Sequence, residues 1–103
     1  MKVTMTDFAR RQVRETAKYI QQVFGKRYRD KFLEDVKETR LLLANNPHLG
    51  SVEPLLSDSP SGYRSIVIAK LNKMIYRILD ESIEIADFWD VRQAPDTLAS
   101  RVK

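Results

Sequence analysis

The sequence predicts an α+β fold with the element order β-α-α-β-β-β, in which an N-terminal helical hairpin packs on one face of a small, mainly antiparallel sheet. Three observations lead to this prediction. Apolar residues recur at helical spacing over residues 9–43, an aperiodic stretch with Gly and Pro follows over 48–62, and residues 63–89 hold three short runs rich in Ile, Val, Tyr and Phe. The helices have no other element against which to bury their apolar stripes, so both are expected to cover the same face of the sheet.

The helical hairpin is expected from two apolar stripes that are joined at Gly25. Thr6 is a good N-cap for the first helix, and Gly25 is a typical C-cap. The second helix follows with almost no connection and is ended by Asn45, Asn46 and Pro47. The stripes are Ala9, Val13, Ala17, Ile20 and Phe24 in the first helix, and Tyr28, Phe32, Val36, Thr39 and Leu43, widened by Leu33 and Leu42, in the second.

The strands are expected in three runs after a loop over residues 48–62. The runs lack Gly and Pro and are separated by short polar breaks, so they should form an antiparallel meander. Near the N-terminus, Lys2–Met5 alternates like a strand but is too short to prove one, and Pro95 with Asp96 can open a short C-terminal helix through Val102. The three runs are Tyr63–Ala69, Lys73–Leu79 and Ile83–Trp89.

The alternation of side chains sorts the strand residues between the two faces of the sheet. Apolar residues occur at both parities in the first two runs, so these strands are expected to be covered on both sides, at least in part, by a neighbour or a partner. In the last run, strict alternation places Asp87 and Trp89 with Ile83 and Ile85, and Phe88 on the opposite side. The face away from the helices is the expected working surface.

At 103 residues the chain is expected to be one domain, spanning 1–103. It has no Cys, which excludes disulfides, thiolate nucleophiles and Cys-ligated zinc, and its single His leaves no His cluster for a metal. We therefore expect neither a metal nor a cofactor. No apolar run approaches the roughly 20 residues of a membrane span, and the N-terminus lacks a signal-peptide core, so the expectation is a cytoplasmic protein without membrane contact.

The charge is concentrated in the predicted hairpin. Up to residue 46 there are eleven Lys and Arg against six Asp and Glu, a net of +5, whereas the rest of the chain has a net of −1. The chain has a net charge of +4 and a pI near 9.5, which favours an anionic partner such as a nucleic acid, a ribosome or an acidic protein. On charge alone, a helix surface made basic for solubility is the favoured interpretation.

Three basic residues, Arg64, Lys73 and Arg77, lie inside the expected strands, where a charge must reach solvent or a carboxylate. Two interpretations stay open. If the three side chains share a face, they form a cationic patch on the uncovered side of the sheet. Otherwise they pair across strands, and for Arg77, in the middle strand, this structural pairing is favoured. The carboxylates within reach are those of Glu84, Asp87 and Asp90.

Catalytic motifs are absent from the sequence: it holds no Walker loop, zinc motif, nucleophile elbow or dinucleotide fingerprint. His48, beside Pro47, is interpreted as a surface or capping residue, because no partner for acid–base work is visible. Arg can stabilise charge on a reacting phosphate but is a poor proton shuttle at neutral pH. The sequence therefore does not demand an enzyme, and no small-molecule substrate is expected.

Several short sequence segments, taken in chain order, resemble the RelE/ParE toxin superfamily of bacterial type II toxin–antitoxin modules over nearly the whole chain. The most specific is the ending, in which Arg92-Gln93 and Pro95 follow a hydrophobic strand. This ending resembles the ParE-like, plasmid-stabilisation branch more than RelE. The segments are Asn46-Pro47 with Gly50, Tyr63-Arg64, Met74–Ile78, Ile85–Trp89, Asp90–Pro95 and Leu98.

The RelE-like branch consists of ribosome-dependent endoribonucleases that cut mRNA in the A site without a metal. For this branch the resemblance implies that Arg64, Lys73 and Arg92 surround the scissile phosphate. The position two after Arg64, often basic in active members, is Ile66 here, and no Tyr or His follows Pro95. These departures remove the expected proton-handling group.

The ParE-like branch inhibits DNA gyrase by binding, and for it Arg64, Arg77 and Arg92 are at most contact or structural residues. In both branches an antitoxin neutralises the toxin, and an acidic antitoxin would suit the positive net charge. We rank a gyrase-binding toxin first, a ribosome-dependent mRNA endoribonuclease second, and a degenerate antitoxin-binding module without toxicity third. The candidate contact residues are Arg64, Lys73, Arg77 and Arg92; Arg64→Ala and Lys73→Ala are expected to leave folding intact and weaken toxicity.

Overall fold

A computed structural model describes residues 1–70 and 72–90 of the chain. It confirms the predicted α+β fold and adds a two-residue strand and a 3₁₀ turn within the predicted loop. The predicted C-terminal helix and Arg92 lie outside the described residues. In chain order the elements are β1 (Lys2–Met5), α1 (Asp7–Phe24), α2 (Lys26–Asn45), β2 (Ser51–Val52), the 3₁₀ turn η1 (Pro54–Leu56), β3 (Arg64–Ile68), β4 (Asn72–Ile78) and β5 (Ser82–Asp90).

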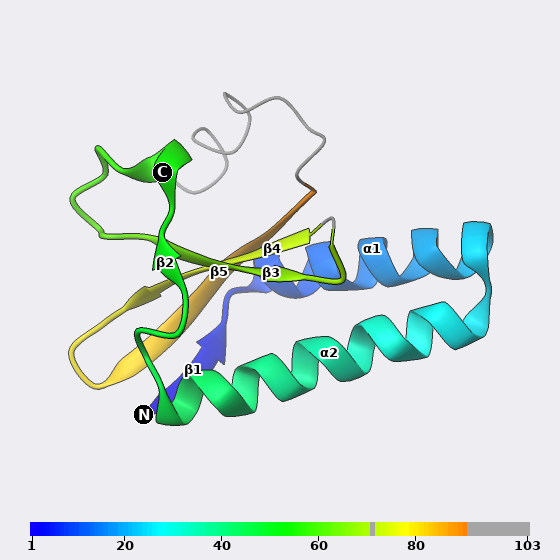
Figure 1. Cartoon of the computed structure of the whole chain (residues 1–103), viewed down its shortest axis with the longest axis horizontal. Coiled ribbons are helices and arrows are strands. Elements are labelled where there is room, and N and C mark those ends of the chain that lie inside the picture. The colour runs from blue at the N-terminus through cyan, green and yellow to red at the C-terminus, as the bar shows by residue number, and fades with distance from the viewer. Residues whose placement is uncertain (71, 91–103) are drawn as a thin grey trace.

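The five strands form one sheet in the order β1-β5-β4-β3-β2 (Figure 1). The predicted meander of β3, β4 and β5 is antiparallel, β2 adds to β3 antiparallel, and β1 pairs with β5 in parallel. The helical hairpin lies against one side of this sheet and continues past the strands at its tip (Figure 1). The architecture is therefore two layers, with the core between the hairpin and the sheet.

The hairpin begins and turns where the sequence predicts. The Thr6 hydroxyl accepts a hydrogen bond from the backbone N–H of Ala9 at 3.0 Å, which is the geometry of an N-cap. Gly25 has φ 101°, a conformation that a side chain would strain, and its N–H donates to the carbonyls of Ile20 and Gln21. Because α2 starts at the next residue, a single glycine makes the whole turn.

The core contains most of both apolar stripes, but not their ends at the hairpin tip, nor Leu33 and Leu42, which were expected to widen the second stripe and are exposed. Phe32 and Leu43 are almost fully buried against strand residues such as Met74 and Ile85. Phe24 and Tyr28 are instead 60% and 62% exposed. The helical periodicity placed these two rings in the core, and this was wrong because the hairpin is longer than the sheet it covers.

An irregularity in β5 changes which side chains face the helices. Ile75 pairs with Asp87 while the next residue, Tyr76, pairs with Ile85, so Ala86 is an extra residue on β5. Ile83, Ile85 and Phe88 consequently all join the core beneath the helices. The strict alternation expected from the sequence is therefore wrong beyond Ile85, and Trp89 packs on the opposite face.

The face of the sheet away from the helices is partly covered by the chain itself. Leu56 of η1 and Tyr63 pack there against Ile75, Ala86 and Trp89, in a second buried cluster. This corrects the expectation of an uncovered working face. The apolar side chains of β3 and β4 that point away from the helices are therefore covered in part by residues 53–63.

Within the described residues, no helix is long and apolar enough to cross a membrane.

Candidate functional site

The basic strand residues do not form one patch, because the sheet register separates them. Arg64 lies opposite Tyr76, whose ring belongs to the core beneath the helices. Lys73 lies opposite Trp89, which packs on the other face. Directly opposed residues of an antiparallel pair point to the same side, so Arg64 and Lys73 point to opposite sides of the sheet.

Lys73 is held by a carboxylate that the sequence analysis did not consider. Its Nζ donates to both carboxylate oxygens of Glu53, the one to Oε2 at 3.2 Å, and Glu53 is 0% exposed. Glu53 Oε1 also accepts from the Ser65 hydroxyl, and the Glu53 backbone N–H donates to the Tyr63 carbonyl. The ion pair ties the 53–63 segment to β4, so the Lys73 charge is neutralised within the fold.

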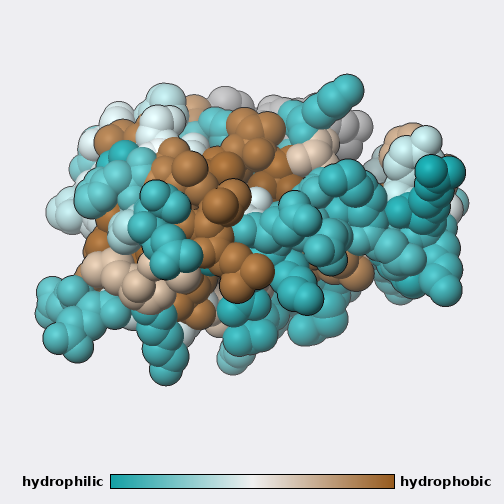
Figure 2. Space-filling model, turned by 60° about the horizontal axis from the view of Figure 1, so that its bottom comes forward, coloured by the Kyte–Doolittle hydropathy of each residue, from teal (hydrophilic) through white to brown (hydrophobic). Residues whose placement is uncertain are grey.

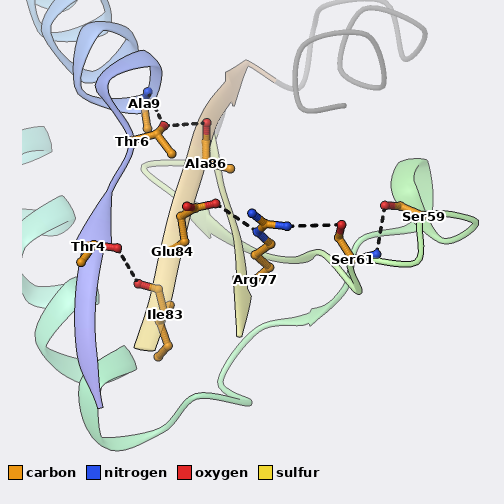
Figure 3. A network of polar contacts seen from close by, with 9 residues as sticks. All are labelled: Thr4, Thr6, Ala9, Ser59, Ser61, Arg77, Ile83, Glu84 and Ala86. Atoms are coloured by element: carbon orange, nitrogen blue, oxygen red, sulfur yellow. Dashed lines mark hydrogen bonds and ion pairs between the residues drawn. The ribbon is translucent and has the colours of Figure 1, made fainter. Parts of the chain in front are cut away.

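Arg77 makes the structural pairing that the sequence favoured. Its Nε donates to Glu84 Oε1 on β5 at 3.0 Å, and its Nη1 donates to the Ser61 hydroxyl at 3.4 Å (Figure 3). The guanidinium also lies 5.8 Å from the centre of the Tyr63 ring. Arg77 therefore joins β4, β5 and the 53–63 segment.

Four of the residues that carry the family resemblance meet in one partly buried cluster, the Tyr76 cluster, made of Pro47, Gly50, Arg64 and Tyr76. The Tyr76 hydroxyl accepts from the Gly50 N–H at 2.9 Å and donates to the Pro47 carbonyl at 2.8 Å. Arg64 Nε donates to the Gly50 carbonyl at 2.8 Å. These residues fix the exit from α2 onto the edge of the sheet, so their role in this structure is architectural.

We expect Tyr76→Phe to lower the free energy of unfolding by about 2 kcal/mol, because it leaves the buried N–H of Gly50 and the Pro47 carbonyl without this partner. The measurement is urea denaturation of the purified variant. The matched control is Tyr19→Phe, since Tyr19 is 49% exposed. Equal stability of the two variants would contradict the role of the hydroxyl.

A groove between α1, α2 and β1, here the α1–α2–β1 groove, has a volume of about 590 Å³. Four cations line it, two from each helix: Arg10, Arg14, Lys37 and Arg40. No carboxylate is among its described lining residues. The remaining lining residues are all aliphatic: Val3, Met5, Val13, Leu33, Val36, Leu41 and Ala44.

Sequence reasoning missed this groove, although its signal was present. It placed the basic excess in the hairpin as a whole, up to residue 46, and did not single out the four cations that line the groove. Arg10 and Arg14 flank Val13 of the first stripe, Lys37 follows Val36 of the second stripe, and Arg40 precedes Leu41. Antiparallel packing of the helices makes these two basic flanks adjacent.

A second groove at the hairpin tip, the hairpin-tip groove, has a volume of about 1020 Å³. Its lining includes the aromatic residues Tyr19, Phe24 and Tyr28 and charges of both signs. One pair is internal: Lys31 Nζ lies 2.7 Å from Asp35 Oδ1, and this hydrogen bond and attraction raise the pKa of Lys31. The mixed charge gives this groove no preference for an acidic or a basic partner.

The surface carries exposed hydrophobic side chains both inside and outside these grooves. On the face shown in Figure 2, hydrophobic side chains form a continuous patch bordered by hydrophilic ones. Such a patch is typical of a surface that contacts another macromolecule. The exposed residues on α2 that contribute hydrophobic area are Tyr28, Leu33, Leu41 and Leu42.

Comparison with known proteins gives one family. Residues 3–95 match the family model described as "ParE toxin of type II toxin-antitoxin system, parDE". No curated protein matches the sequence significantly.

The solved structures that are similar in fold include the following two. One, described as "Chromosomal ParDE TA system from P. aeruginosa", superimposes with a TM-score of 0.72 at 18% identity, covering 88% of this chain and 96% of the other. The second, described as "YoeB-YefM complex from Staphylococcus aureus", has a TM-score of 0.54 at 22% identity, covering 85% and 93%. At these identities the similarity concerns the fold alone.

Proposed function

The chain belongs to the ParE toxin family of type II toxin–antitoxin systems, and on this premise we propose that it inhibits growth by binding DNA gyrase and is neutralised by a cognate antitoxin. In this mechanism the chain acts through contact surfaces rather than through chemistry of its own. It needs no metal, no cofactor and no proton-transfer group.

The observation that supports binding over catalysis is the separation of Arg64 from Lys73. An endoribonuclease must bring its charge-stabilising and proton-transferring groups to one phosphate, at hydrogen-bond distance. Here the two side chains point to opposite sides of the sheet. Arg64 is bonded to the Gly50 carbonyl, and Lys73 is paired with a buried carboxylate. Phosphate binding by Lys73 would cost its pairing with Glu53.

The experiment is induced expression in a bacterial host that lacks the antitoxin. We expect filamentous cells and a DNA damage response while protein synthesis continues. Co-expression of the cognate antitoxin should restore growth. Collapse of translation, with mRNAs cut within codons on ribosomes, would establish the RelE-like alternative instead. Normal growth despite soluble expression of the chain would favour the third interpretation, a degenerate module that binds the antitoxin without being toxic.

A further inference from the structure

We propose that the hairpin tip, residues 16–29, binds single-stranded DNA, with bases stacked on its exposed aromatic rings and phosphates beside its cations. The choice of DNA rests on the proposed function, because gyrase acts on DNA, whereas the binding of a single strand rests on the tip itself. The tip is a surface separate from the α1–α2–β1 groove, since none of the described residues that line that groove belongs to it.

The charge of the hairpin tip is of one sign. Residues 16–29 hold no Asp or Glu but four cations: Lys18, Lys26, Arg27 and Arg29. Arg29 is used within the fold, because it contacts Asp30 at 2.8 Å and its Nη1 donates to Gln21 Oε1 of the other helix at 2.6 Å. The other three cations are exposed and make no ion pair within residues 1–70 and 72–90. Their charge is therefore available to the phosphates of a partner.

Two of these cations lie where a helix gains no stability from them. Lys26 and Arg27 open the first turn of α2, which holds no acidic residue and has no side-chain cap. The N-terminal end of a helix carries a partial positive charge, so cations there are unfavourable. Lys26 and Arg27 therefore do not stabilise α2, and an anionic partner would relieve their repulsion from the helix dipole.

The aromatic rings of the tip remain largely exposed. Tyr19, Phe24 and Tyr28 are 49%, 60% and 62% exposed, and the last two rings lie 6.1 Å apart at a tilt of 55°. Tyr28 shares the first turn of α2 with Lys26 and Arg27, so a ring and two cations occupy one small surface. Proteins that bind single strands combine a basic surface with rings on which successive bases stack.

The tip is also accessible, because the hairpin continues past the strands (Figure 1). A strand of nucleic acid can therefore reach both helices of the tip without displacing any part of the sheet. Exposed amides of Gln21 and Gln22, in the last turn of α1, lie beside Phe24 in the chain. Amide groups can hydrogen-bond the edges of unpaired bases.

Three other partners fit the hairpin tip less well. A second copy of the chain, in a symmetric contact, would bring Lys26 and Arg27 against the same cations. A duplex keeps its bases stacked on one another, so the rings would find no free base face. A membrane surface would desolvate the amides of Gln21 and Gln22 without giving them a hydrogen-bond partner.

The first test compares two double neutralisations that change the net charge equally. Lys26→Gln with Arg27→Gln alters the tip. Arg11→Gln with Lys37→Gln is the matched control, because both residues are exposed on the helices outside the tip, and Lys37 lines the α1–α2–β1 groove. Fluorescence anisotropy gives Kd for a short labelled single strand of DNA and for a duplex and an RNA of the same sequence. Co-sedimentation measures binding to vesicles that contain phosphatidylglycerol.

We expect the tip variant to bind single-stranded DNA about tenfold more weakly, and the control to stay within about twofold of the wild type. The slope of log Kd against log salt should fall by about 1.4 in the tip variant, since each lost phosphate contact removes about 0.7 for a single strand. The Tm of the tip variant should equal or exceed that of the wild type, because cations are lost from a helix N-terminus. A merely structural role of the two cations would lower the Tm instead.

The second test removes a stacking surface. Tyr28→Ala is expected to weaken the binding of single-stranded DNA about tenfold, which is within the range measured for loss of one base–aromatic stack. Leu41→Ala is the matched control, because Leu41 is also on α2 and also 62% exposed but lies outside the tip. The control should leave Kd unchanged, and circular dichroism should show that both variants are folded.

Equal losses in the tip variant and its control would overturn the inference, because net charge alone would then explain the binding. No binding of single-stranded DNA by the wild type, or tighter binding of the duplex or the vesicles, would overturn it as well. Tighter binding of the RNA would overturn the choice of DNA and support the ribosome-dependent alternative. These measurements contain no gyrase, so a chain that binds the single strand but does not inhibit gyrase contradicts the proposed function and not the binding of a single strand.

Discussion

Lys73→Met is expected to lower the free energy of unfolding by roughly 3 kcal/mol, because it leaves the carboxylate of Glu53 buried without its cation. Among the described residues, the Ser65 hydroxyl, at 3.4 Å, is then the one remaining side-chain partner. Since domains of this size have total stabilities of about 5–15 kcal/mol, the loss should be plain in urea denaturation. This revises the sequence-based expectation that Lys73→Ala leaves folding intact.

The control is Lys70→Met, since Lys70 is exposed and makes no ion pair with the described residues. The double variant Glu53→Gln with Lys73→Met should recover part of the loss, because no buried charge remains uncompensated. A Lys73→Met variant as stable as the control would show that the cation is free in solution, and an RNA-binding role for Lys73 would regain support.

Gly50→Ala is expected to destabilise the fold by about 3 kcal/mol, which corresponds to a Tm lower by about 12–15 °C for a chain of this length. A Cβ at Gly50 would lie 2.5 Å from the Ser65 carbonyl oxygen and 2.9 Å from Cγ1 of Ile66. The first of these atoms is backbone in a paired strand, so it cannot move without disturbing the bond between β2 and β3. The Tyr76 cluster would be displaced with it.

Gly62→Ala is the control for Gly50→Ala, because it measures the cost of backbone strain without a steric clash. Gly62 has φ 66°, but no atom of the described residues lies within 4 Å of a Cβ there. We expect a loss of about 1 kcal/mol from the positive φ alone. If Gly50→Ala were no more destabilising than Gly62→Ala in thermal unfolding, the close packing of the 47–50 segment on β3 would be wrong.

The helical hairpin could be predicted because its determinants are local in the sequence. Thr6 caps the first helix through a contact three residues away, and Gly25 both ends it and turns the chain. The pairing of Arg77 with Glu84 was also predictable, because both lie in adjacent strands of a short hairpin. Such features depend on few residues and on near neighbours.

The remaining features depend on contacts that no local pattern encodes. The extra residue at Ala86 changes which side chains of β5 face the helices, and the neighbouring sequence does not indicate a bulge. Glu53 lies in a Pro- and Ser-containing stretch that suggests solvent, yet it is buried because Lys73, twenty residues later, folds onto it. A sequence pattern shows that Lys73 needs a carboxylate, but not which one.

Sequence reasoning overlooked the groove cations for a related reason. Sequence reasoning selected Arg64 and Lys73 because charged residues are unusual inside strands. In the structure, Arg64 donates to the Gly50 carbonyl and Lys73 pairs with Glu53. The four cations of the α1–α2–β1 groove make no ion pair with the described residues, and they lie on the helices, where a basic flank is usually attributed to solubility. Only the packing of α1 against α2 shows that Arg14 and Arg40 share one groove.

The most direct test of the account is a supercoiling assay with purified components. Gyrase, ATP and relaxed plasmid are incubated with the purified chain, and a parallel reaction contains ribosomes programmed with mRNA. The account predicts that supercoiling stops, that the antitoxin restores it, and that the mRNA stays intact. Undisturbed supercoiling together with mRNA cut in the ribosomal A site would contradict it.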